Sequence, residues 1–290
     1  MTSSGKESPA TSFPMDDTQG GSPFASIIIV NYNGLAYTQE AVLSILKYSQ
    51  SSEIIIVDNC STDESAETLA EEFSSLKIIS LNENRGFGYG CNRGAEAAKG
   101  KYLFFLNNDT LLTEDTPAIL TSYLETNPTV AACGPKLLNR DGSFQVSFGL
   151  DPSLVNEWIV RRWQRPSKRA SGASVHSLER RYAGAKVDWV TAAALMMRTD
   201  VFRQLDGFDE TFFMYFEDAD LCRRVRQLNY SVRYLTMTSV VHFRGQSAKE
   251  GSSIINREYR RSQINYYRKH RSPIVMGVLK AYLAVRPATK

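Results

Sequence analysis

The sequence is poor in the features that mark several protein classes. It has four cysteines in 290 residues, Cys60, Cys91, Cys133 and Cys222, and no two of them are close enough for a CxxC pair. This spacing argues against a disulfide scaffold and against a zinc site. Because so few thiols in a chain of this size are typical of a reducing compartment, we expect a cytoplasmic protein.

Long apolar runs and a strong charge of either sign are also missing. No apolar run reaches the roughly 18 residues that span a bilayer, and the N-terminal stretch has no apolar core like that of a signal peptide. The 34 Lys and Arg residues nearly balance 31 Asp and Glu, which gives a net charge of +3. So small an excess does not indicate a nucleic-acid-binding protein.

The composition divides the chain into three parts. Residues 1–23 are rich in Ser, Thr, Gly and Pro, which predicts a disordered tail. Residues 24–248 carry the apolar runs of a large domain. Residues 249–290 predict a basic, aromatic helix followed by a short apolar helix. This last part either packs onto the core or docks at an anionic membrane surface, where Lys and Arg meet headgroups and Tyr lies at the interface.

Strands and helices alternate in the first half of the large domain. SIIIVNYNG, EIIIVDN, LKIISL and KYLFFLNND are short apolar runs that predict strands, and AYTQEAVLSILKY has the apolar spacing of a helix. Continuous apolar strands between helices indicate an α/β fold with a mostly parallel sheet that is covered on both faces.

The second half is less regular. WVTAAALMMR predicts a buried strand or a tight helix, FFMYFEDADLCRRVRQLN an aromatic stretch and an amphipathic helix, and YSVRYLTMTSVVHF two strands. The basic segment 161–181 is either a solvated loop or a mobile flap near an anionic ligand.

Polar residues follow three of the predicted strands. Ligands of open α/β sheets bind at the carboxyl ends of the strands, so we expect these side chains to share one crevice. They are Asn31 and Asn33, Asp58 and Asn59, and Asn107, Asn108 and Asp109.

Six motifs occur in an order that resembles a known family. They are SIIIVNYNG, IIIVDNCSTDES, NENRGFGYGCNRG, FLNNDT, the block from VDWVTAAALMMR through LDGFDETFFMYFEDADLCRRV, and VVHFRGQS. The set resembles the inverting family 2 glycosyltransferases of the GT-A fold, and within them the bacterial rhamnosyltransferase-like group that builds surface polysaccharides. The resemblance implies a Rossmann-like GT-A domain over 24–248 and a helical extension over 249–290.

The resemblance places a nucleotide sugar at the strand ends. It sets Asp58 against the nucleobase, and a carboxylate can accept the imide N–H of uracil or thymine. Alternatively, Asp58 only caps the next helix. By the same resemblance Asn31 and Asn33 hold the nucleoside, and we assign Asn84 and Arg85 to the phosphates.

The family's DxD-type motif is present here as Asn107-Asn108-Asp109. Only Asp109 is a carboxylate, so we expect Asp109 to bind the divalent cation, Mn²⁺ or Mg²⁺, that neutralises a diphosphate, and Asn108 to contact the donor. Taken alone, NND is a strand-to-turn element. The resemblance makes His242 a second metal ligand, although a lone His after an apolar run is usually a core residue.

Three carboxylates begin the predicted amphipathic helix, where acidic residues also favour the helix dipole. Transfer to an alcohol needs a general base, and a metal-bound diphosphate needs no separate acid. The family's ED motif makes Asp218 the base, while Glu217 orients hydroxyl groups. We expect Asp220 to support the helix.

Asp188 and Trp189 are predicted to line the sugar or acceptor pocket. Family members often have Ser-Gly-Ala nearby, where this chain has Thr191-Ala192-Ala193.

The sequence thus predicts a metal-dependent, inverting glycosyltransferase. Its favoured donor is dTDP-L-rhamnose, with a UDP-hexose as rival, and its acceptor is a hydroxyl of a growing, lipid-linked glycan. A non-catalytic nucleotide-sugar-binding scaffold is the second hypothesis. A nucleotidyltransferase would need a basic loop after the first strand, where this chain has NYNGLAYTQE.

Overall fold

The computed structural model describes residues 24–164, 179–243 and 252–285. The predicted N-terminal tail and most of the basic segment 161–181 lie outside these ranges.

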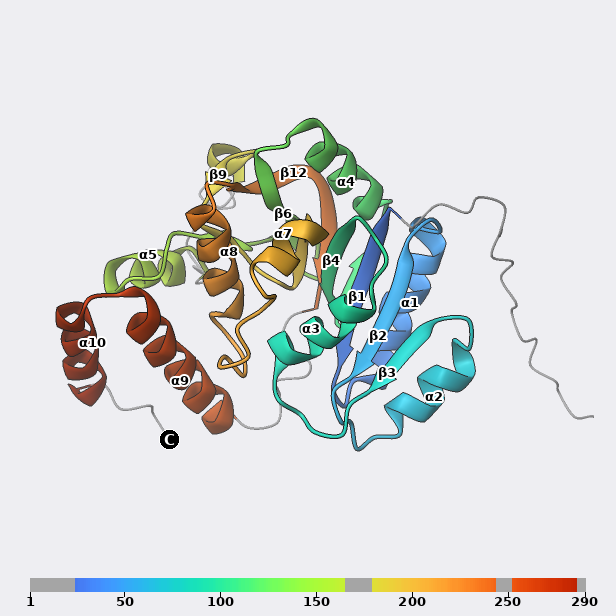
Figure 1. The fold of residues 1–290 in the computed structure, drawn as a ribbon, viewed down its shortest axis with the longest axis horizontal. Coiled ribbons are helices and arrows are strands. Elements are labelled where there is room, and N and C mark those ends of the chain that lie inside the picture. Colours follow the sequence, from blue (N-terminus) through green and yellow to red (C-terminus); the bar gives the residue numbers. More distant parts are fainter. Residues whose placement is uncertain (1–23, 165–178, 244–251, 286–290) are drawn as a thin grey trace, which may run out of the picture.

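A ten-stranded sheet forms the centre of the molecule (Figure 1). Its strands are β1 (Ala25–Asn31), β2 (Glu53–Asp58), β3 (Lys77–Ser80), β4 (Tyr102–Asn107), β5 (Thr110–Leu112), β6 (Val130–Leu138), β7 (Phe144–Gln145), β9 (Lys186–Val187), β11 (Ala194–Arg198) and β12 (Ser231–His242). The order is β3-β2-β1-β4-β11-β6-β12-β5, with β7 beside β6 and β9 beside β12. The half from β3 to β4 is parallel, whereas β11 is antiparallel to both of its neighbours. Two further strands, β8 (Phe148–Gly149) and β10 (Trp189–Val190), form a separate antiparallel pair.

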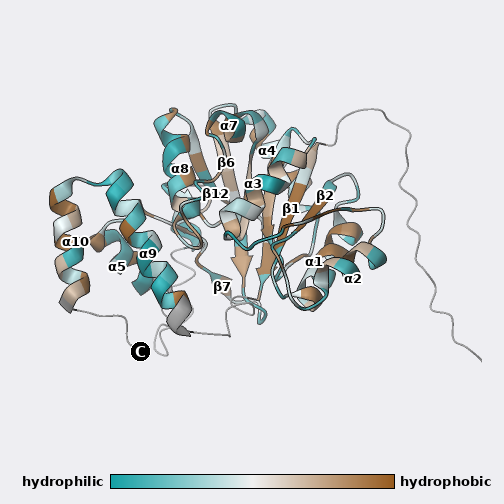
Figure 2. Cartoon of the chain, turned by 60° about the horizontal axis from the view of Figure 1, so that its bottom comes forward, coloured by the Kyte–Doolittle hydropathy of each residue, from teal (hydrophilic) through white to brown (hydrophobic). Residues whose placement is uncertain are grey.

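Helices cover both faces of the sheet, as predicted. They are α1 (Leu35–Tyr48), α2 (Ser65–Glu72) and α4 (Thr116–Thr126) on one face, and α3 (Phe87–Ala97), α7 (Thr199–Gln204) and α8 (Glu217–Gln227) on the other. Side chains alternate along β1, so Ile27 and Ile29 pack toward α1 while Ile28 and Val30 pack toward α3. Both sets are buried, which explains the unbroken apolar run in the sequence (Figure 2).

The glycines of NENRGFGYGCNRG bring α3 close to β1. A Cβ atom on Gly94 would lie 2.5 Å from Ile28 Cγ2, and one on Gly90 would lie 2.9 Å from Val30 Cγ1. Gly86 has a φ of +102°, and a Cβ there would meet the Phe213 carbonyl. These glycines therefore serve close packing around the start of α3.

The C-terminal part forms two helices, as predicted. α9 (Ser252–His270) and α10 (Pro273–Val285) pack with α5 (Leu154–Gln164) at one end of the molecule (Figures 1 and 2). Tyr266 and Tyr267 of α9 are fully buried there. Those two tyrosines are core residues, so the interpretation that placed Tyr at a membrane interface is wrong for them. None of the described helices is long and apolar enough to cross a membrane.

Two local predictions need correction or refinement. YSVRYLTMTSVVHF is one strand, β12, because a register irregularity between Leu235 and Ser239 carries its polar middle past β6. Thr238 in that stretch is buried and hydrogen-bonds Thr116 and Glu114. WVTAAALMMR divides into β10, a turn and β11.

Candidate active site

The carboxyl ends of β1 and β2 form a buried polar cluster around Asp58. Asn31 Nδ2 donates to Asp58 Oδ1 at 2.9 Å, and Ser61 donates its backbone N–H to Asp58 Oδ2 at 3.0 Å. The side-chain oxygen of Asn31, Oδ1, accepts from Thr38 Oγ1 at 2.7 Å. Asn31 is fully buried, so the structure gives it the task of holding Asp58. Asp58 shapes the turn that leads to Ser61, while α2 begins later with no side-chain cap.

Asn33 and Asn84 organise the loops on either side of Asp58. Asn33 is exposed with a φ of +49°, and its side-chain oxygen accepts from Thr62 N at 2.7 Å. Asn84 Oδ1 accepts from Asn59 Nδ2 and from Gly86 N, both at 3.0 Å. The two loops thus flank Asp58, and contacts of Asn33 with a nucleoside and of Asn84 with phosphate stay predictions.

Arg85 is exposed beside this wall. Its guanidinium lies 3.3 Å from Glu210 and stacks 4.3 Å from the centre of the Tyr89 ring. A phosphate contact would require Arg85 to exchange the Glu210 carboxylate for the phosphate, so its assignment stays a prediction.

Asn108 and Asp109 follow β4, and Asn108 joins the polar cluster around Asp58. Asn108 Nδ2 donates to Thr38 Oγ1 at 3.2 Å and approaches Asn31 Oδ1 at 3.4 Å. Asp109 is almost fully buried, and its Oδ1 lies 3.2 Å from His242 Nε2 at the end of β12. The β4 and β12 ends therefore bring together the two residues that were assigned to a metal.

The side chain of Gln145, on β7, fixes the orientation of His242. Gln145 Nε2 donates to Asn139 Oδ1 at 2.9 Å, which turns its carbonyl oxygen toward His242 Nδ1 at 2.7 Å. In the tautomer with its proton on Nδ1, His242 donates to this oxygen and presents the Nε2 lone pair to Asp109, as many metal-binding histidines do.

This pair fits a divalent cation. The Asp109 carboxylate and the His242 ring nitrogen face each other at 3.2 Å, and both groups are common ligands of divalent cations. No group of three or more His, Cys, Asp or Glu side chains in the described ranges could hold an ion alone. The Asn107 amide, 3.4 Å from His242 Nε2, is a neutral neighbour. A cation here would thus also need oxygens from a bound diphosphate or water.

The candidate base lies at the start of α8. Asp218 is half-buried, and its carboxylate accepts from Ala219 N at 2.7 Å and Ala192 N at 3.4 Å. The two residues before the helix, Tyr215 and Phe216, have φ values of +69° and +66°. Each such conformation costs about 1–3 kcal/mol for a residue other than glycine, and strain of this kind is common at functional sites.

Helix α9 braces this strained turn. Ser262 Oγ donates to the Met214 carbonyl at 2.7 Å. The Phe216 ring lies 5.2 Å from Tyr259 and 5.6 Å from Tyr266, measured between centroids. The C-terminal extension therefore supports the backbone that delivers Asp218.

Burial sets the charge state of the two carboxylates. It raises the pKa of Asp218 to about 6, opposed by the hydrogen bonds from Ala219, Ala192 and Thr191. Burial, with the nearby Asp218 charge, raises the pKa of Glu217 well above its usual value. Of the two carboxyl groups, Glu217 is the one whose neutral form burial favours, while Asp218, with a pKa of about 6, is mostly ionised at neutral pH, as a general base requires.

Asp220 has the supporting role that was expected. It is fully buried and pairs with Arg224 at 2.7 Å, Lys269 at 2.8 Å and His270 at 2.6 Å. Burial alone would raise the pKa of Asp220, but these partners lower it to about 2.

The turn at 191–193 lies between the end of β4 and the candidate base. Ala193 accepts a backbone hydrogen bond from Asn107 at 3.0 Å, while Ala192 donates to Asp218. The close packing of this turn explains why small residues occur there.

Asp188 and Trp189 come just before the turn at 191–193 in the chain. Asp188 pairs with Arg226 at 3.2 Å, two turns beyond Asp218 on α8, and accepts from Asp151 N at 2.8 Å. Trp189 Nε1 donates to the Leu150 carbonyl at 2.9 Å. These contacts hold the β8–α5 connection in place, and a contact with sugar stays a prediction.

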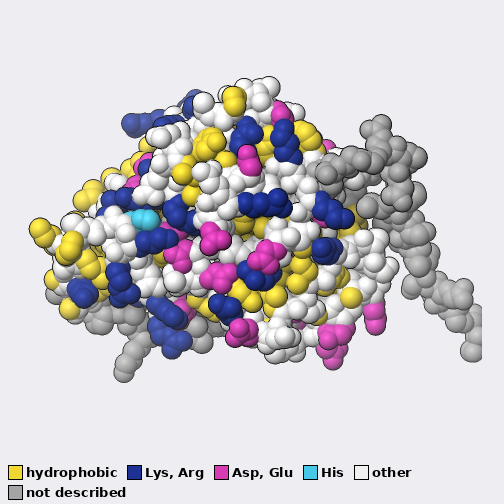
Figure 3. Space-filling model, in the orientation of Figure 1, with side chains coloured by type: hydrophobic (Ala, Val, Ile, Leu, Met, Phe, Trp, Pro, Cys, Tyr) yellow, Lys and Arg dark blue, Asp and Glu magenta, His cyan; other side chains and the backbone are white. Residues whose placement is uncertain are grey.

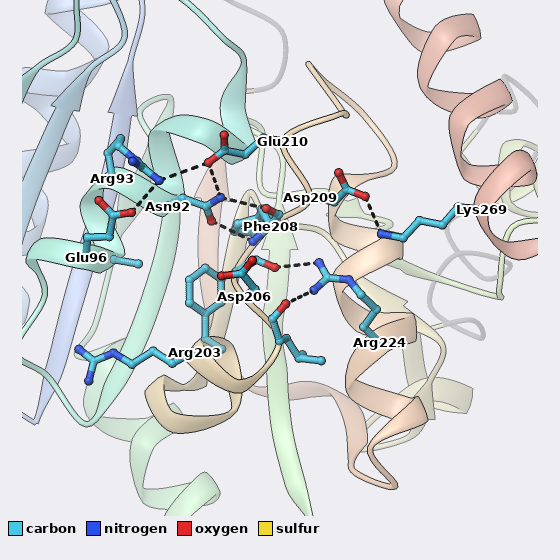
Figure 4. A pocket seen from close by; sticks show the side chains of 14 residues that line it. Asn92, Arg93, Glu96, Arg203, Asp206, Phe208, Asp209, Glu210, Arg224 and Lys269 are labelled. Atoms are coloured by element: carbon cyan, nitrogen blue, oxygen red, sulfur yellow. Dashed lines mark hydrogen bonds and ion pairs between the residues drawn. The ribbon is translucent and has the colours of Figure 1, made fainter.

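A cavity of about 840 Å³ opens between α3, α7 and α8 (Figure 4). None of the predicted site residues lines it. Its charged side chains pair with one another, with Arg93 2.6 Å from Glu96 and Lys269 2.6 Å from Asp209. The strand ends therefore remain the candidate site.

The sequence analysis missed two residues that hold predicted site residues in place by hydrogen bonds. Gln145 lies in a two-residue strand within a region that was read as irregular, and no motif marks it. Ser61 belongs to the motif IIIVDNCSTDES but was given no role, yet it donates to Asp58 and accepts from Asn31 and Asn33. Only the fold brings these pairs together.

The order of the mixed sheet and the polar residues at its strand ends fit a glycosyltransferase of the GT-A type. A model of the family named "Glycosyl transferase family 2" matches residues 26–190, and the chain belongs to that family. The match ends before Asp218 and His242.

Relatives and solved structures agree with this assignment. The N-acetylglucosaminyl-diphospho-decaprenol L-rhamnosyltransferase of Mycobacterium tuberculosis is 23% identical over 234 residues, which are 76% of each chain. GalNAc-T7, solved with UDP, GalNAc and Mn²⁺, is similar over 84% of this chain and 48% of its own, with a TM-score of 0.61 and 17% identity. The mannosyltransferase PcManGT from Pyrobaculum calidifontis, in complex with GDP-Man and Mn²⁺, is similar over 97% and 86%, with a TM-score of 0.56 and 14% identity. The chain is thus a glycosyltransferase with the GT-A fold.

Proposed function

We propose that the protein is an inverting, metal-dependent enzyme that transfers a sugar from a pyrimidine nucleotide to a hydroxyl of a growing glycan. Two observations carry this proposal: Asp109 faces His242 at 3.2 Å, and the turn at 191–193 bonds both Asp218 and the backbone of Asn107, which begins the motif that ends in Asp109. A scaffold that only bound nucleotide would not need a carboxylate whose pKa is raised to about 6.

Each part of the site has one task in this reaction. Asp58 accepts the imide N–H of the base, and Asn33 and Asn84 shape the walls around the nucleoside. Asp109 and His242 would hold Mn²⁺ or Mg²⁺, and the cation would supply positive charge that stabilises the diphosphate leaving group. Asp218 takes the proton of the acceptor hydroxyl as that oxygen attacks the anomeric carbon.

We favour dTDP-L-rhamnose as the donor because the Mycobacterium tuberculosis relative is a rhamnosyltransferase. A UDP-hexose is the rival, since uracil and thymine present the same imide edge to Asp58, and GalNAc-T7 was solved with UDP. The same relative's name includes a diphospho-decaprenol, so we propose a lipid-linked saccharide as acceptor, on the cytoplasmic side of the membrane.

Release of nucleoside diphosphate tests the proposal. Purified protein is incubated with a panel of dTDP- and UDP-sugars and Mn²⁺ or Mg²⁺, with donor binding measured in the same samples by calorimetry. We expect release from one donor, and we expect both EDTA and Asp109→Ala to abolish it. Binding without release, even after addition of lipid-linked acceptors, would favour the scaffold. If no nucleotide sugar bound, both hypotheses would fail.

A further inference from the structure

Large apolar side chains are concentrated on two neighbouring helices. Ten such side chains are exposed among the described residues, and five of them lie on α5 and α10. The five, with their exposed fractions, are Val155 (66%), Trp158 (63%), Ile274 (80%), Val278 (53%) and Tyr282 (38%). We call them the α5/α10 apolar face.

The two helices lie next to each other. Leu154 of α5 packs against the cluster that contains Met276 and Leu279 of α10. Farther along, Arg161 of α5 interacts electrostatically with Tyr282. Ile274, Val278 and Tyr282 recur every four residues and share one side of α10. Figure 3 shows apolar side chains at this end of the molecule, where Figure 1 places α10.

Basic side chains lie on both helices of this face, and one of them, Arg161, also pairs with Glu157 at 3.7 Å. The neighbouring cations of α9 are largely neutralised, since Lys269 pairs with Asp209 and Arg271 with Asp151. On α5, Arg161 and Arg162 are exposed, and Arg162 lies 5.9 Å from the centre of the Trp158 ring. Lys280 is the single charged residue of α10.

We propose that the α5/α10 apolar face docks in the plane of an anionic lipid bilayer. A 13-residue helix with one apolar side is too short to span a membrane but is suited to lie at its surface. The basic side chains beside it complement anionic headgroups, and Trp and Tyr are favoured at that depth. A neutral protein partner would gain nothing from this charge.

This inference rests on the proposed function. An enzyme that transfers sugar to a lipid-linked acceptor has to bind that acceptor at the surface of a bilayer. It also moves the membrane contact away from α9. Tyr266 and Tyr267 there are buried, and their hydroxyl groups donate to Asp151 and Glu157.

Vesicle flotation of the full-length protein tests the docking. We expect binding to vesicles of phosphatidylglycerol and phosphatidylcholine, weaker binding to phosphatidylcholine alone, and weakening by salt. The double variant Ile274→Asp/Val278→Asp should partition about a hundredfold less, because each apolar side chain contributes roughly a factor of ten or more. The matched control is Leu43→Asp, which alters an equally exposed apolar residue on α1 (49%) and should bind as the wild type does.

Three results would overturn the inference. They are no flotation of the wild type, equal flotation of the double variant, and a self-associated wild type whose dimer the double variant abolishes. The last result would show that a second copy covers the face. Thermal unfolding checks that the variants fold. Donor hydrolysis in the same samples separates the two ideas, because loss of docking leaves hydrolysis intact, whereas failure of the proposed function leaves flotation intact.

Discussion

The raised pKa of Asp218 leads to a quantitative prediction for its removal and for pH. In Asp218→Asn the side chain keeps its shape and can still accept from Ala219 N, but it cannot take a proton. General-base catalysis contributes about 10²- to 10⁴-fold, so we expect kcat to fall by that factor, or about 3–5 kcal/mol of barrier. Glu217→Gln is the matched control. Because burial raises the pKa of Glu217 and so favours its neutral form, its neutral amide replacement should cost only a few-fold.

The pH dependence follows from the same value. With a pKa of about 6, Asp218 is about 90% ionised at pH 7 and about 10% ionised at pH 5, so kcat/KM should fall about tenfold over that range. A carboxylate with an ordinary pKa near 4 would lose only about a tenth.

The assay is initial-rate release of nucleoside diphosphate in the presence of acceptor, with unfolding measured at each pH. The raised pKa also means that ionised Asp218 destabilises the fold, because stability is lost as pH rises from about 4 to about 6. Asp218→Asn should therefore keep or raise the melting temperature at pH 8. A wild-type profile that is flat from pH 5 to pH 7, or an Asp218→Asn variant with near-normal turnover, would refute the assignment of the base.

Three further outcomes follow from the site. Asp109→Asn and His242→Ala should each weaken Mn²⁺ binding at least tenfold in the presence of nucleoside diphosphate, as followed by electron paramagnetic resonance. Unchanged binding would refute the assignment of Asp109 and His242 as metal ligands. Asp58→Asn should raise the KM for the donor about tenfold or more while kcat changes little; an unaltered KM would contradict the nucleobase contact. Ser262→Ala, which removes the hydrogen bond to the Met214 carbonyl, should lower kcat several-fold without altering donor KM, and a fall confined to thermal stability would mean that α9 braces the fold but not the base.

The fold could be predicted from the sequence where one local signal was enough. The runs that became β1, β2 and β4 are apolar on both faces, and only a covered sheet accommodates such strands. β12 could not be predicted, because Thr236 and Thr238 interrupt its apolar pattern. The partners that make Thr238 acceptable, Thr116 and Glu114, are over a hundred residues away in the chain.

The sequence motifs were enough to select the candidate site residues. The strand ends gathered Asp58 and Asn108 in one polar cluster, because parallel strands end at the same edge. The charge states of Glu217 and Asp218 could not be read from the sequence, since they depend on burial. Nor could the orientation of His242, which depends on a glutamine nearly a hundred residues earlier.

The left-handed pair Tyr215–Phe216 has a consequence for hybrid proteins. Chimeras between relatives are commonly cut where one domain ends, and the end of β12 looks like such a place. Here that cut would join the catalytic turn of one parent to the α9 of another, and the rings of Tyr259 and Tyr266 would no longer match Phe216. A chimera should therefore take the C-terminal segment and the turn at 212–216 from the same parent.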